Sequence, residues 1–109
     1  LGRPNWYIGT RISVASPLNL DLRLGTQGAR QTRYIRVKIY DAATNLVAVT
    51  PNSGAGPTLP IGPGGISGTG DTSCQFLSGG DDLLMNVTGV EKVNIKPSST
   101  TYVTVEGYL

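Results

Sequence analysis

The stretch Leu18-Asn19-Leu20-Asp21-Leu22-Arg23-Leu24 holds four leucines at alternate positions, with a polar residue in each gap. Successive side chains of a β-strand point to opposite faces, so this spacing places all four leucines on one face of a strand. A helix would distribute them around its circumference. Pro17 precedes the run at a strand start, where a missing amide donor is tolerated. The stretch therefore predicts a strand with one buried face and one solvated face.

The same two-residue period recurs along the rest of the chain, and no segment keeps a helical period. Strands are predicted over residues 6–15, 18–24, 33–40, 46–50, 74–77, 83–87, 90–95 and 101–108. Residues 41–45 predict a tight hairpin connection between two of them. Turns at intervals of about 8–12 residues are typical of a β-sandwich or a small barrel. We expect an all-β fold, a single-domain antiparallel β-sandwich, with a jelly roll or a partly open barrel as the variant.

Length and composition favour one folded domain over residues 1–109. Charged residues make up only 15% of the chain and the net charge is +2, whereas disorder usually combines high net charge with low hydropathy. No run approaches the roughly 20 apolar residues of a membrane-spanning helix. A membrane partner is therefore not expected.

Residues 51–70 differ from the rest of the chain, because seven of these positions are glycine and four are proline. Proline lacks the amide donor that a strand needs, and glycine resists ordering. This segment predicts a long loop or an assembly arm that lies on a neighbouring subunit, with Leu59, Ile61 and Ile66 as its candidate anchors. A disordered surface loop is the alternative.

The chemistry of the side chains argues against catalysis. The chain has no histidine and a single cysteine, Cys74. It therefore cannot assemble a Ser–His–Asp or Cys–His site, and it has too few ligands for zinc or iron–sulfur centres. Asp81 and Asp82 are adjacent, so on a strand they would point to opposite faces, and calcium usually takes six to eight oxygens. We predict no enzyme activity, no catalytic residue, no metal and no cofactor.

One strand carries a candidate binding face. Tyr34, Arg36, Lys38 and Tyr40 share one parity, so two aromatic rings flank two cations on one side of a sheet. Aromatic rings stack on sugars or bases and cations follow phosphates. With the aromatic pair at residues 6–7 this face would suit a glycan, and with Arg33 it would suit a nucleic acid, although a net charge of +2 argues against the latter. An ordinary solvent-exposed face is the alternative.

The closing run at 102–108 predicts an exposed edge strand that a partner could extend, with Tyr102, Val103, Val105 and Tyr108 as its candidate contacts. An edge, an arm, little charge and no reactive site favour a structural subunit of a larger assembly. Such a subunit would form a homo-oligomer and would bind its own copies and a major shell or fibre subunit. An extracellular fibre subunit or a glycan-binding module is the alternative.

The segments 83–90 (LLMNVTGV), 93–95 (VNI) and 102–109 (YVTVEGYL) carry a family likeness. They resemble small virion structural proteins of tailed bacteriophages, and capsid decoration (cement) proteins are the nearest type. The resemblance implies a non-enzymatic protein of the virion, bound in many copies to a capsid lattice, often as oligomers that clamp neighbouring shell subunits. It transfers no functional residue to this chain.

Overall fold

The structure is a computed structural model, and it describes residues 2–22, 32–40, 46–51 and 75–109. These residues form eight strands and no helix, which confirms the predicted all-β class. The strands are β1 (Trp6–Ile12), β2 (Leu18–Asp21), β3 (Tyr34–Ile39), β4 (Leu46–Pro51), β5 (Gln75–Ser78), β6 (Asp82–Asn86), β7 (Lys92–Pro97) and β8 (Thr101–Tyr108). Each of them overlaps one of the predicted runs. No helix in the described residues is long and apolar enough to cross a membrane.

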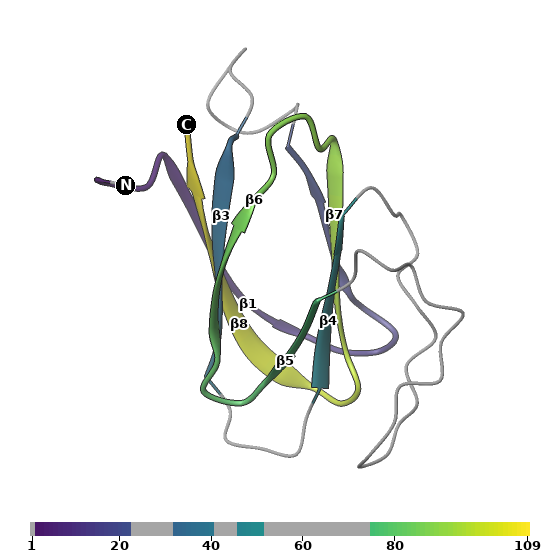
Figure 1. Cartoon of the computed structure of the whole chain (residues 1–109). Helices are drawn as coiled ribbons and strands as arrows, with labels where there is room; N and C mark the ends of the chain where they lie inside the picture. Colours follow the sequence, from purple (N-terminus) through teal and green to yellow (C-terminus); the bar gives the residue numbers. More distant parts are fainter. Residues whose placement is uncertain (1, 23–31, 41–45, 52–74) are drawn as a thin grey trace.

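The strands form two antiparallel sheets that pack face to face (Figure 1). Sheet A has the order β1-β8-β3-β6, and sheet B has the order β2-β7-β4-β5. The predicted β-sandwich is therefore confirmed. The pairings are nested, because β1 pairs with β8, β2 with β7, β3 with β6 and β4 with β5. Nested pairs divided between two sheets in this way form a jelly roll, which is the predicted variant of the fold.

The predicted hairpin between the strands at 33–40 and 46–50 is wrong. β3 belongs to sheet A, where its partners are β6 and β8, whereas β4 belongs to sheet B. The chain changes sheets between these two strands, so they do not pair. Residues 41–45 themselves lie outside the described residues.

The predicted edge strand at 102–108 is also wrong. β8 lies between β1 and β3 and is paired on both sides. Its inward side chains Val103 and Val105 are fully buried, and Glu106 is its only charged residue. A strand with so little charge suits the interior of a sheet, because edges are usually protected by charge or proline. The edges of sheet A are β1 and β6.

The core lies between the inward faces of the two sheets. Its members from sheet A include Ile35, Val37, Val103 and Val105, and those from sheet B include Leu20, Val47, Val49, Val93 and Ile95. Leu20 and Leu22 from the opening stretch are buried as predicted, and Leu18 packs against the same cluster. Leu24 lies outside the described residues.

One end of the core is closed by Trp6. Its register partner on β8 is Gly107, and the indole ring lies on this glycine so closely that a Cβ there would overlap Cε2 and Nε1 of the ring. The indole Nε1 donates a hydrogen bond of 2.9 Å to Thr32 Oγ1. Glycine at 107 is therefore required by the close approach of an aromatic ring.

Candidate functional site

The outward side of sheet A carries all five tyrosines of the chain. We call this surface the tyrosine face. Its members are Tyr7, Gly9 and Arg11 from β1, Tyr102, Thr104, Glu106 and Tyr108 from β8, Tyr34, Arg36 and Lys38 from β3 with Tyr40 directly after it, and Asp82, Leu84 and Asn86 from β6. Their common side follows from alternation, because residues of the opposite parity, such as Ile35 and Val105, belong to the core.

Three tyrosines gather at one corner of this face. The rings of Tyr40 and Tyr102 meet edge to face, with 5.9 Å between their centroids. The hydroxyls of Tyr7 and Tyr102 are hydrogen-bonded to each other above Gly9. A Cβ on Gly9 would lie 2.5 Å from Tyr102 Oη and 3.0 Å from Tyr7 Oη. The absent side chain thus leaves the space in which the two tyrosines meet.

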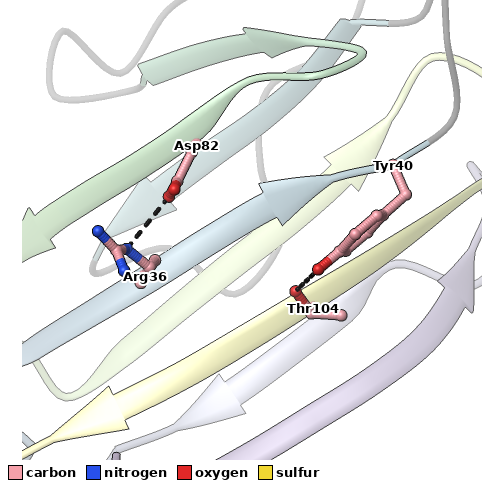
Figure 2. Close-up of polar contacts among 4 residues, drawn as sticks. All are labelled: Arg36, Tyr40, Asp82 and Thr104. Atoms are coloured by element: carbon pink, nitrogen blue, oxygen red, sulfur yellow. Dashed lines mark hydrogen bonds and ion pairs between the residues drawn. The ribbon is translucent and has the colours of Figure 1, made fainter.

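Two of these rings remain open to solvent. Tyr7 is 60% exposed and Tyr40 is 57% exposed, the largest values among the large hydrophobic residues described as exposed. Tyr40 also contacts Thr104 on β8, whose Oγ1 lies 3.4 Å from the tyrosine hydroxyl (Figure 2). The corner therefore offers exposed aromatic surface on side chains that are held by their neighbours.

Charged groups surround the rings. Arg11 places its guanidinium carbon 5.9 Å from the centroid of the Tyr102 ring, within the range of a cation–π contact. Arg36 on β3 faces Asp82 on β6, with 3.3 Å between Nε and Oδ1 (Figure 2). Because both side chains are about 40% exposed, this ion pair contributes little to stability. Its effect is to fix the guanidinium beside the face.

The environment of Tyr7 raises its pKa above the ordinary value of 10.0. The largest cause is desolvation of its hydroxyl, followed by the tyrosines at 102 and 40, the hydrogen bond to Tyr102 and the carboxylate of Glu106. Each of these disfavours the phenolate, and this agrees with a hydroxyl held among the other tyrosines.

Alkaline titration is expected to reveal this coupling. The raised pKa means that the contribution of Tyr7 to stability is fully present below pH 10.0 and is lost as the pH rises through its folded-state pKa. In an ultraviolet titration, Tyr7→Phe should remove one ionisation step that lies above the ordinary tyrosine pKa of 10.0. An unchanged titration curve, apart from one lost tyrosine of ordinary pKa, would contradict the cluster.

The outward side of sheet B offers a different surface. Ala48, Thr50 and Asn94, at the centre of that side, are fully buried, and Asn94 donates a hydrogen bond of 2.8 Å to Asn19. Phe76 on β5 is its one exposed aromatic among the described residues. Exposed aromatic surface is therefore concentrated on sheet A.

The four residues of the predicted binding face all lie on the tyrosine face. Tyr34, Arg36 and Lys38 are half-buried and Tyr40 is exposed. Sequence reasoning missed that Tyr102 and Tyr108 share this side, because they come from a strand far away in the chain. The signal available was the matching parity of the tyrosines at 102 and 108, which alternation alone assigns to one face.

Other predicted residues are placed elsewhere. Trp6, considered with Tyr7 for glycan binding, lies on the inward side of β1 and packs against the core. Asp81 closes the turn between β5 and β6, because its Oδ2 accepts a 2.8 Å hydrogen bond from Ser78 N. In the described part of the chain no three or more acidic, histidine or cysteine side chains group as a metal site would need. The candidate arm lies outside the described residues, together with its predicted anchors Leu59, Ile61 and Ile66. Cys74 also lies outside them.

Comparison of the chain with family models, curated proteins and solved structures found no match.

Proposed function

We propose that this protein is a non-enzymatic structural subunit that binds a protein partner within a larger particle, with the tyrosine face as its contact surface. The observation that carries the proposal is the gathering of every tyrosine of the chain on one side of one sheet. Tyr7 and Tyr40 are more than half exposed, the tyrosines at 34 and 102 are half-buried, and Tyr108 is buried. Tyrosine and arginine are enriched in protein interfaces, and their truncation often costs the most binding energy. An ordinary solvent face needs no such concentration of rings.

The charges of the face support a protein partner over a polyanion. Three cations, Arg11, Arg36 and Lys38, are interspersed with two carboxylates, Asp82 and Glu106. Glu106 is the register partner of Arg36 on β8, and Asp82 contacts it from β6. A phosphate backbone approaching Arg36 would therefore meet carboxylates on both sides. A protein surface with an apolar centre and alternating charges fits this pattern better.

Two further arguments support a proposal about the nature of the particle. Jelly-roll sandwiches are used in viral capsid domains and in lectins, an analogy of fold that does not by itself assign function. The sequence resemblance to capsid decoration proteins points in the same direction. We therefore assign the protein to a virion, as a decoration, cement or minor coat protein that stabilises the shell. An extracellular fibre would use the same face for the same purpose.

Replacing Tyr7 and Tyr40 together by serine is expected to abolish this association. Truncation of a tyrosine hot spot costs about 2 kcal/mol or more, so the double variant should bind more than a hundredfold more weakly. The measurement is the distribution of labelled protein between particle and free fractions of a density gradient of the native source. Phe76→Ser, which removes an exposed ring from sheet B, is the matched control and should remain with the particle.

The same variants decide between partner classes. A panel of oligosaccharides and a single-stranded oligonucleotide at low salt are tested against the wild-type chain and the double variant. Saturable glycan binding that is lost in the variant would assign the face to carbohydrate. Oligonucleotide binding that weakens steeply with salt would assign it to nucleic acid. Either result, or a double variant that stays with the particle, would overturn the proposal.

A further inference from the structure

β1 is an open edge of sheet A, since β8 is its one partner strand among the described residues. It spans seven residues, whereas the other edge strands, β2, β5 and β6, span four, four and five. Long edges are usually protected by proline, by lysine or by a bulge, because they present unpaired backbone groups. β1 contains no proline or lysine, Arg11 is its one charged residue, and its register with β8 is uninterrupted.

The direction of the backbone groups on β1 follows from alternation. Tyr40 N donates to Tyr102 O over 3.2 Å, so the backbone of Tyr102 faces β3. The next residue, Val103, therefore faces β1, where Thr10 is its register partner. By the same alternation the N–H and C=O groups of Tyr7 and Gly9 point to the open side of β1. These groups are oriented to form the hydrogen bonds of a β-ladder with another strand.

The side chains at this edge are also incompletely covered. Trp6 and Ile8 point inward and pack against the core, yet both are only half-buried. Inward residues of the interior strands, such as Ile35 and Val103, are completely buried. An additional strand beside β1 would remove apolar surface of Trp6 and Ile8 from water.

We propose that the occupant of this edge is β1 of a second copy, paired antiparallel about a two-fold axis at Gly9. Gly9 is the midpoint of Trp6–Ile12, so this is the register that pairs all seven residues of the strand with those of the second copy. A two-fold axis at one residue gives a closed dimer. Sheet A of each copy then continues into that of the other, and the two tyrosine faces become one surface.

The charged residue of β1 favours the same register. With the axis at Gly9, Tyr7 of each copy lies opposite Arg11 of the other, a cross-strand pair of ring and guanidinium. Arg11 already makes such a contact with Tyr102 within the chain. An axis at Arg11 would instead place two guanidinium groups directly opposite each other, which is destabilising. The glycine at the centre adds no side chain to the crowded position beneath the tyrosine hydroxyls.

The first test compares two proline variants by sedimentation velocity at high protein concentration. A contact made by one pair of seven-residue strands should be small, in the weak class of interfaces below about 1,200 Å². The wild-type dimer should therefore dissociate on dilution. Tyr7→Pro removes an amide that faces the open side of β1, and the dissociation constant should rise about tenfold or more. Leu84→Pro makes the equivalent change on the other edge, β6, and should leave the dimer intact. A wild-type chain that is monomeric, or a dimer lost only in Leu84→Pro, would refute the pairing.

The second test reads the register directly. In a Cys74→Ser background, Tyr7→Cys and Arg11→Cys are prepared as separate proteins. Directly opposed residues of a strand pair lie about 5.5 Å or less apart at Cα, within disulfide range. A mixture of the two proteins should cross-link on mild oxidation, while each protein alone should not. Cross-linking of either protein with itself, or none in the mixture, would exclude the axis at Gly9.

The pairing goes beyond the proposed function and does not depend on it. Tyr40 directly follows β3, which β8 separates from β1. Tyr40→Ser should therefore weaken binding to the particle and leave the dimer unchanged. The two proposals can consequently fail separately.

Discussion

Ile35→Ala is expected to lower the free energy of unfolding by about 2–5 kcal/mol, a large part of the roughly 5–15 kcal/mol that stabilises a typical domain. Ile35 is completely buried and lies on β3, between Met85 on β6 and Gly107 on β8. Both neighbouring strands hold the backbone in place, so the site cannot collapse around the lost methyl and methylene groups. Urea denaturation followed by circular dichroism measures the effect.

Leu84→Ala provides the matched comparison. Leu84 is an aliphatic residue on β6 with the opposite parity, and it is 47% exposed on the tyrosine face. Its truncation should change the free energy of unfolding by no more than about 0.5 kcal/mol. Equal losses at residues 35 and 84 would contradict the assignment of the two faces of sheet A.

Gly107→Ala is expected to destabilise the protein by about 1–3 kcal/mol, because a new methyl group would occupy the place of the Trp6 ring. The displaced indole would also lose its hydrogen bond to Thr32. Trp6 is the only tryptophan of the chain, so its fluorescence reports on this end of the core alone. We expect the emission maximum to move to longer wavelength as the ring becomes more hydrated.

Gly80→Ala is the control that distinguishes backbone strain from steric overlap with a side chain. Gly80 has φ +87° and no heavy atom of a neighbour within 4 Å of the added Cβ. A non-glycine residue in this left-handed conformation costs about 1–2 kcal/mol, so the stability should fall while the tryptophan emission stays unchanged. A Gly107→Ala protein with the wild-type emission maximum would show that the indole does not lie on residue 107.

The strands and their faces were largely predictable because they depend on local alternation. The opening stretch at 18–24 and the run at 33–40 each place one parity of residues in the core, and this is what the structure shows for Leu20, Leu22, Ile35 and Val37. Strand ends were less accurate. β1 ends at Ile12 although the predicted run continued to 15, because Ser13 and Ser16 close a turn through reciprocal backbone hydrogen bonds.

The order of the strands was not predictable, since alternation says which side of a strand is buried and nothing about its neighbours. The run at 102–108 looked suited to an edge because it is last among the strands and rich in β-formers. Its low charge is compatible with the interior of a sheet, but the edge strand β1 also has only one charged residue, so composition did not decide the position. Half of the candidate site was not predictable for the same reason. The face at 34–40 was recognised within one strand, whereas its combination with Tyr7 and Tyr102 depends on pairings between distant segments.

The pairing of β1 with β8 has a consequence for synthesis on the ribosome. Sheet A cannot join β1 to β3 until β8 has left the exit tunnel, because β8 is the strand that separates them. Until then the nascent chain carries apolar strands without their neighbours, a state prone to association with other chains. Contacts between segments so far apart in sequence also make folding slow, commonly milliseconds to seconds for β-sandwiches. A polypeptide interrupted before β8 would therefore lack the centre of a sheet rather than one of its margins.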